Sequence, residues 1–75
     1  MNGKLAEIVA DIFFLDEDEV TMELTPDDVG LWNSLNHLRL ITAVESAFEI
    51  KLTMSEIQSI DTIEKLNELV GRHSD

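Results

Sequence analysis

The stretch from residue 31 to residue 48, LWNSLNHLRLITAVESAF, constrains the fold more than any other part of the chain. At about 100° of rotation per residue, one broad arc of this stretch is apolar and consists of Leu40, Ile41, Ala43, Val44, Ala47 and Phe48. The opposite arc is polar and consists of Thr42, Glu45, Ser46 and Glu49. This pattern predicts an amphipathic helix that buries one face in a small domain.

The start of this helix has an unusual combination of residues. Asn33 is a good N-cap, because its side chain can accept a hydrogen bond from a first-turn amide, and Ser34 is then the first helical residue. The helix start favours an anion attached to Ser34 by roughly 0.3–1 kcal/mol. Leu35 and Leu38 project among the polar residues at the same end, which predicts that they contact partner proteins.

A first amphipathic helix is predicted from Lys4 to Leu15, with Asn2 or Gly3 at its start, because apolar residues recur there every three or four positions. Phe13 and Phe14 are expected to widen its buried face. A long connection follows, in which the acidic run 16–19 is interpreted as a solvated loop. The connection is longer than the ~12–15 residues expected of an unstructured loop. Four apolar residues are therefore expected to hold it on the core: Val20, Met22, Leu24 and Val29.

Two more helices are predicted after residue 48. Thr53 and Glu56 have the spacing of a capping box and start a short helix that extends to Ile60. A final helix begins near residues 61–64 and is expected to end at Gly71, followed by a frayed tail over residues 72–75. The prediction is an all-α bundle of three principal helices and one short helix, with a long loop between the first and second helices.

Composition excludes several classes of function. The formal net charge of -11, from 16 acidic and 5 basic residues, argues against nucleic acid binding and favours basic partner surfaces.

The chain has no cysteine, and two isolated histidines do not form a zinc site. Counting from Asp16, the acidic run lacks the glycine and glutamate of a calcium loop. No metal site is therefore expected. No apolar run approaches the ~20 residues of a membrane span.

The triplet Asn33-Ser34-Leu35 resembles the Asp-Ser-Leu signature of the acyl carrier proteins and related peptidyl carriers. The resemblance continues without a gap over most of the chain after Trp32. The matching positions are Leu38, Leu40, Ala43, Glu45, Phe48, Ile50, Leu52, Glu56, Ile60, Thr62 and Leu66. Residues 1–75 are therefore expected to form a single carrier-protein domain.

The resemblance implies a function without bond chemistry by the protein itself, so the chain is not expected to be an enzyme. It implies that a phosphopantetheinyl transferase attaches 4'-phosphopantetheine to Ser34, and that acyl groups travel on this arm as thioesters. The implied partners are acyl-transferring, ligating or condensing enzymes with basic docking patches. The implied docking residues are Leu35, Leu38, Arg39, Thr42 and Glu45. A monomer with a cytoplasmic location is expected.

Two departures from the family pattern bear on the pathway. Asn33 replaces the usual aspartate, and Arg39 stands where general fatty-acid carriers present an acid. Both make the docking face less acidic, which favours a specialised carrier. The alternatives are a peptidyl or aminoacyl carrier and an unmodified acidic helical interaction module. A serine hydrolase using Ser34 and His37 is disfavoured, because the chain lacks a G-x-S-x-G elbow.

Overall fold

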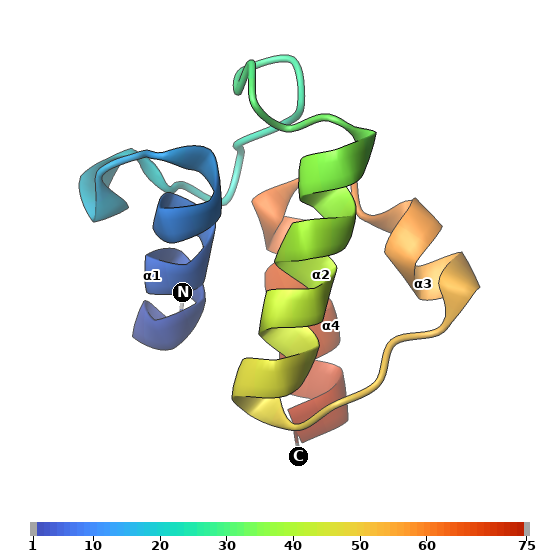
Figure 1. The fold of residues 1–75 in the computed structure, drawn as a ribbon. Coiled ribbons are helices and arrows are strands. Elements are labelled where there is room, and N and C mark those ends of the chain that lie inside the picture. Colours follow the sequence, from blue (N-terminus) through green and yellow to red (C-terminus); the bar gives the residue numbers. More distant parts are fainter. Residues whose placement is uncertain (1, 75) are drawn as a thin grey trace.

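The computed structural model describes residues 2–74 and the side chains of residues 2–73. The α-helices of this part are α1 (Gly3–Phe13), α2 (Ser34–Phe48), α3 (Met54–Ser59) and α4 (Ile63–Ser74), and a 3-10 helix η1 spans Glu17–Glu19. Figure 1 shows α1 and α2 side by side and antiparallel, α4 behind α2, and α3 on the side of α2 away from α1. The described residues contain no strand, and the all-α prediction is confirmed.

Three helices supply most of the core. The nine largest fully buried side chains are Phe13, Leu5, Leu40, Ile63, Leu66, Leu69, Val9, Val44 and Val70, which come from α1, α2 and α4. On the predicted apolar arc of α2, Leu40, Ile41 and Val44 are buried, and the two alanines and Phe48 are partly buried. No polar or charged residue is buried among residues 2–73. Burial of apolar surface therefore accounts for the cohesion of the bundle.

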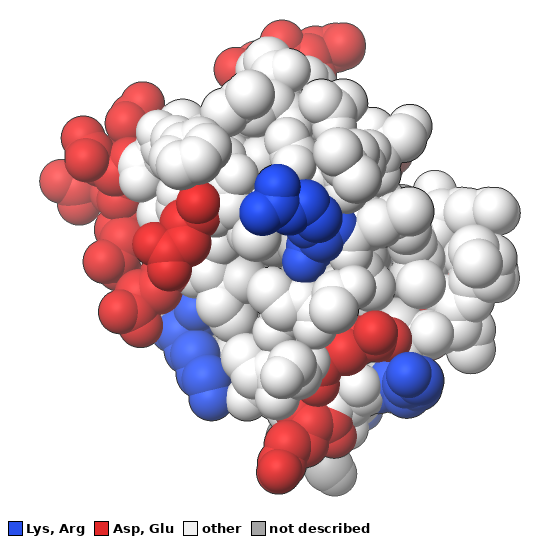
Figure 2. Space-filling model, in the orientation of Figure 1, with Lys and Arg blue, Asp and Glu red and all other residues white. Residues whose placement is uncertain are grey.

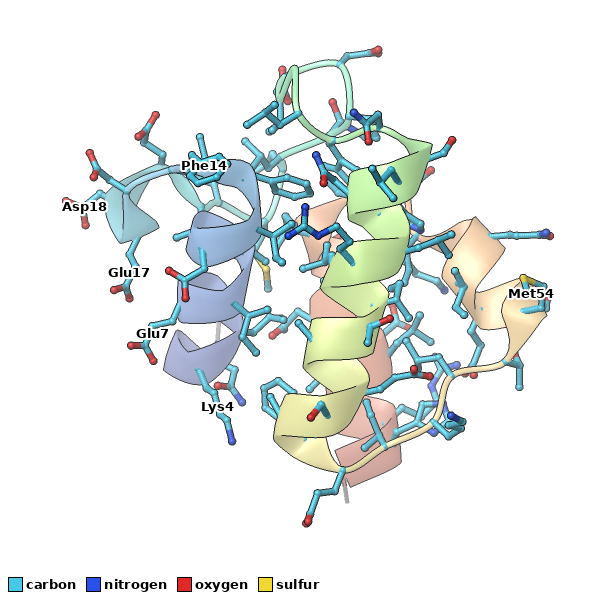
Figure 3. All side chains as sticks on the ribbon, viewed as in Figure 1. Lys4, Glu7, Phe14, Glu17, Asp18 and Met54 are labelled. Atoms are coloured by element: carbon cyan, nitrogen blue, oxygen red, sulfur yellow. The ribbon has the colours of Figure 1, made fainter. Side chains whose placement is uncertain are left out.

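α1 begins as predicted, because the side chain of Asn2 accepts hydrogen bonds from the amides of Lys4 and Leu5. It ends differently at Phe14, which adopts the left-handed conformation with a φ of 56°. The side chain of Phe14 is 84% exposed. The expectation that Phe14 lies on the buried face is wrong, since the chain reverses direction at this residue and turns the ring away from the core. Figure 3 shows Phe14 at the loop end of α1.

The connection between α1 and α2 lies on the core as expected. Val20 and Val29 are buried, and Met22 and Leu24 are half-buried. Its backbone is also bonded to the start of α4: the Leu24 carbonyl accepts from the Ile63 amide at 3.1 Å, and the Met22 carbonyl accepts from the Glu64 amide at 3.0 Å. These amides would otherwise lack helical partners. The loop and the last helix therefore satisfy each other's backbone groups.

The acidic run is more ordered than a solvated loop. Residues 17–19 form η1, and the Asp16 amide donates to the Glu19 carboxylate at 3.0 Å. All four acidic side chains remain exposed. The run is therefore solvated as expected, although its backbone is helical.

The C-terminal part departs most from the prediction. α4 continues through Gly71 to Ser74, so the expected helix end at Gly71 and the frayed tail over residues 72–74 are wrong; Asp75 lies outside the described residues. Arg72 pairs with Glu68 one turn earlier, and His73 Nε2 lies 2.8 Å from Glu56 Oε2 in α3. These contacts, together with the tolerance of helices for a single glycine, explain the extra turn.

None of the helices in residues 2–74 has the length and apolar character needed to cross a membrane.

One stability prediction arises from the end of α2. Glu49 closes this helix with a φ of 55°, a conformation that costs a residue with a side chain about 1–2 kcal/mol and that glycine adopts freely. Glu49→Gly also removes a negative charge from the negative end of the helix. We expect the free energy of unfolding to rise by about 1 kcal/mol and the melting temperature by about 4–8 °C.

Glu49→Ala is the matched control, because alanine removes the same charge and keeps the unfavourable conformation. Thermal unfolding followed by circular dichroism measures all three proteins. A melting temperature of Glu49→Gly at or below that of Glu49→Ala would contradict the backbone argument.

Candidate functional site

The candidate site is built on the first turn of α2. The Asn33 side chain accepts from the Asn36 amide at 2.9 Å, and the Asn33 carbonyl accepts from the His37 amide at 2.8 Å. Asn33 is thus the N-cap and Ser34 the first helical residue, as predicted. Asn36 donates its side-chain amide to the Leu31 carbonyl at 2.7 Å, which fixes the approach of the loop to the helix.

Ser34 presents a free hydroxyl at this helix start. Its side chain is exposed, and within residues 2–74 neither its hydroxyl nor the amides of Ser34 and Leu35 have a hydrogen-bond partner. Unpaired first-turn amides and the positive end of the helix favour negative charge at this position. The site therefore suits a serine that carries a phosphodiester.

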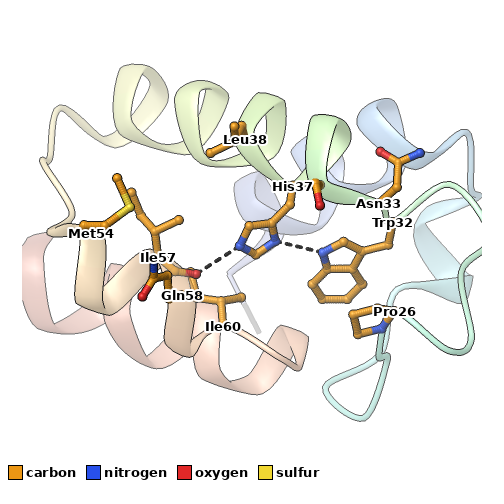
Figure 4. A pocket seen from close by; sticks show the side chains of 10 residues that line it. Pro26, Trp32, Asn33, His37, Leu38, Met54, Ile57, Gln58 and Ile60 are labelled. Carbon is orange, nitrogen blue, oxygen red and sulfur yellow. Dashed lines mark hydrogen bonds between the residues drawn. The ribbon is translucent and has the colours of Figure 1, made fainter.

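A groove of about 530 Å³ opens beside Ser34, between α2 and α3. Its lining is mostly apolar and consists of Pro26, Trp32, Asn33, Ser34, His37, Leu38, Met54, Ile57, Gln58 and Ile60. Figure 4 shows the labelled side chains on both sides of this groove. Other than His37, none of these residues is titratable. The groove can thus accept an extended, uncharged group that begins at Ser34.

His37 holds the walls of this groove together (Figure 4). The Trp32 indole donates from Nε1 to His37 Nδ1 at 2.9 Å, and His37 Nε2 lies 3.0 Å from the Ile57 carbonyl of α3. An indole N–H can only donate and a carbonyl can only accept, so this geometry suits an imidazole that accepts at Nδ1 and donates from Nε2. One side chain therefore connects the loop, α2 and α3.

Trp32 packs the loop onto the bundle. It is 5% exposed and stacks on Phe13 of α1, with 5.3 Å between the ring centroids. The bonding of His37 to Trp32 and Ile57 was not predicted. Both imidazole nitrogens are engaged away from Ser34, so the geometry does not support His37 as the base of a serine nucleophile.

No residue within α3 is buried, and Ile57 is the hydrophobic side chain of this helix that packs against the core. The predicted capping box is present: the Glu56 amide donates to Thr53 Oγ1 at 3.1 Å, and the Thr53 amide donates to Glu56 Oε1 at 2.9 Å.

The pKa of Glu56 is lowered, chiefly by the Thr53 amide and then by the hydrogen bond to His73. Since the folded pKa lies below the unfolded one, ionised Glu56 stabilises the fold above its unfolded pKa. This contribution is lost as the pH falls through the folded pKa.

Four of the five predicted docking residues lie on the open surface of α2. Leu35 is 67% exposed and Leu38 is 53% exposed, and Arg39 and Thr42 are also exposed. The fifth, Glu45, is half-buried and accepts a hydrogen bond from the Leu52 amide at 2.9 Å through Oε2. Glu45 therefore holds the connection after α2 in place, and only part of its carboxylate is open to a partner.

The described residues include no cluster of side chains able to hold a metal ion.

Comparison with known proteins agrees with this geometry. The family described as "Phosphopantetheine attachment site" matches residues 3–70. The acyl carrier protein of Clostridium perfringens is 36% identical over 76 residues, covering 100% of this chain and 99% of that protein. This chain belongs to the acyl carrier protein family. The acyl carrier protein of Petrotoga mobilis is 34% identical over 91% of this chain and 80% of its own length.

A solved structure gives the same result for the fold of the carrier. The solution NMR structure of the holo acyl carrier protein from Geobacter metallireducens superposes with a TM-score of 0.84 at 30% identity, covering 93% of this chain and 80% of that one. The prosthetic group of the carrier is 4'-phosphopantetheine. Acyl carrier proteins work with phosphopantetheinyl transferases and with enzymes that handle acyl groups.

Proposed function

We propose that Ser34 is the attachment point of 4'-phosphopantetheine and that the chain delivers acyl groups to partner enzymes. The observation that carries this proposal is the exposed hydroxyl of Ser34 at the first position of α2, beside an apolar groove. When bound, the group supplies a terminal thiol that carries an acyl group as a thioester, and the chain has no cysteine of its own. Tethering raises the effective concentration of the cargo at a docked enzyme.

The residues of the chain have binding and positioning roles. The unpaired amides of Ser34 and Leu35 would hold the phosphodiester oxygens, and Asn33 keeps that turn in place. The groove between α2 and α3 would shelter part of an apolar cargo from water, with Ile57 and Met54 on its far wall. The protein itself contributes no catalytic group and acts as a carrier.

The proposed partners are a phosphopantetheinyl transferase and acyl-transferring, ligating or condensing enzymes. Leu35, Leu38, Thr42 and the open part of Glu45 would form the contact for enzymes with basic docking patches, in keeping with the net charge of -11. Arg39 makes this face less acidic than the usual face of general fatty-acid carriers, which favours a dedicated acyl pathway. We further propose that the protein is a cytoplasmic monomer with a single carrier domain over residues 1–75.

The test is the intact mass of the purified protein after incubation with coenzyme A and a phosphopantetheinyl transferase of broad specificity. We expect the mass of one phosphopantetheine to be added, on the peptide that contains Ser34. Ser34→Ala should gain no mass, and Ser46→Ala should be modified like the wild type. An adduct on Ser46, Ser55 or Ser59 would refute the site. No adduct at all on the folded wild type would favour the unmodified interaction module.

A further inference from the structure

A second groove lies on the other side of α2, against α1, and it is separate from the groove at Ser34. Its volume is about 370 Å³, and its lining consists of Ile12, Leu35, Leu38, Arg39, Thr42 and Ala43. Only Leu38 belongs to both grooves. The floor and walls are apolar apart from the hydroxyl of Thr42 and the guanidinium of Arg39, and Thr42 donates its hydroxyl proton to the Leu38 carbonyl at 3.0 Å.

Arg39 is the informative residue of this groove. It is exposed, and no acidic side chain within the described part of the chain lies within 4 Å of it. Within the described residues, Arg72 is the one lysine or arginine that pairs with a carboxylate, that of Glu68. What distinguishes Arg39 is its place in the lining of a mostly apolar groove. Its guanidinium has five donors that can bind a group from another molecule.

The distribution of charge on the surface over α2 also favours a contact with a negatively charged group. Figure 2 shows a basic side chain near the centre of the face over α2, surrounded mostly by uncharged surface, with acidic side chains toward the edges. A carboxylate that meets a guanidinium beside apolar side chains makes a stronger pair than one in open water, since water is displaced from both. The groove thus presents one positive charge beside an apolar surface.

We propose that this groove binds a helix of a partner protein that places an apolar side chain against Leu35 and Leu38 and a carboxylate on Arg39. The spacing on the partner would be one helical turn, since side chains four residues apart share a helix face. This proposal deepens the docking part of the proposed function. It concerns a partner with an acidic contact, distinct from enzymes that use basic patches, and Arg39 would select between the two kinds.

The salt dependence of binding should separate these two kinds of partner. The net charge of -11 repels an acidic helix at long range, and salt screens that repulsion over about 8 Å at physiological ionic strength. The contact with Arg39 is shorter than this distance and is screened less. Affinity for an acidic helix should therefore rise from very low salt to physiological salt, whereas affinity for a basic partner should fall.

The test uses the unmodified protein, so its outcome does not depend on whether Ser34 carries a prosthetic group. Two synthetic 18-residue amphipathic helical peptides are compared, identical except that Glu or Lys lies four residues after a central leucine. Binding is followed by the amide resonances of ¹⁵N-labelled protein at physiological salt. We expect the Glu peptide to shift the amides of Ile12, Leu35 and Ala43. Arg39→Glu should weaken this binding roughly fivefold or more and bind the Lys peptide at the groove instead.

Lys51→Glu is the matched control, because it makes the same charge change at an exposed residue that does not line the groove, and it should bind the Glu peptide like the wild type. The proposal is overturned if the Glu peptide leaves the groove amides unshifted. It is also overturned if the Lys peptide shifts the groove amides of the wild type equally. Groove amides that shift on concentrating the protein alone would identify a second copy of the chain as the occupant and would overturn it too.

Discussion

Replacing Leu40 with alanine is expected to lower the free energy of unfolding by about 2–5 kcal/mol, whereas Leu35→Ala should leave it nearly unchanged. Leu40 is 0% exposed and Leu35 is 67% exposed, and both lie in α2. The same truncation thus creates a cavity at one position and removes only surface contacts at the other. Since small domains have a total stability of about 5–15 kcal/mol, Leu40→Ala should be partly unfolded at moderate temperature.

Urea unfolding followed by circular dichroism measures this difference, and transferase kinetics give the opposite ranking. Leu35→Ala and Leu38→Ala should slow the modification of folded protein, because both residues form the proposed docking surface. A stable Leu40→Ala would contradict the burial argument. Loss of stability in Leu38→Ala together with normal transferase kinetics would show that Leu38 serves the fold.

Trp32→Ala is expected to have the largest effect on stability, a loss of about 3–5 kcal/mol. The substitution removes the stacking on Phe13 and leaves His37 Nδ1 without its donor. Trp32→Phe should cost less, because a phenyl ring can still pack on Phe13 and only the indole N–H is lost. A hydrogen bond of this kind contributes about 0.5–1.5 kcal/mol.

A double-mutant cycle tests whether Trp32 and His37 act as a unit. His37→Ala in the wild type leaves a buried indole N–H unpaired, which costs about 1–3 kcal/mol. The same substitution in Trp32→Phe should cost less, since no donor remains to be left unpaired. The difference is measured by urea unfolding of the four proteins. Additive effects within error would contradict the coupling.

The sequence predicts the helices of this protein well because their signals are local. Asn33 and Thr53 accept first-turn amide bonds that depend only on residues within three positions, and the apolar repeat of α2 follows from the helical period alone. The exposed positions of Leu35 and Leu38 follow from the same projection. Ser34 is predicted as the attachment point from its neighbours in the sequence, and the structure adds its exposure and the adjoining groove.

The features that were missed depend on contacts between distant parts of the chain. His73 is separated by 17 residues from Glu56, and His37 by 20 residues from Ile57, so no local pattern indicates either pair. The error at Phe14 has a different origin: the helical period continues through that residue, and the left-handed end of α1 is set by the turn into the loop. The error at Gly71 arose because glycine is a frequent helix end but also occurs within helices.

The hydrogen bonds from the Ile63 and Glu64 amides to the loop carbonyls also set an order of events during folding. They join residues about 40 positions apart, and such distant contacts form late, because closing a long stretch of chain costs entropy before any bond is gained. The loop leads directly into Asn33 and Ser34. During synthesis, the loop can therefore be held in its native place only after residues 63 and 64 have left the ribosome, whereas the cap at Asn33 can form earlier because its hydrogen bonds are local. A transferase that recognises the loop together with Ser34 would act on a nearly finished chain.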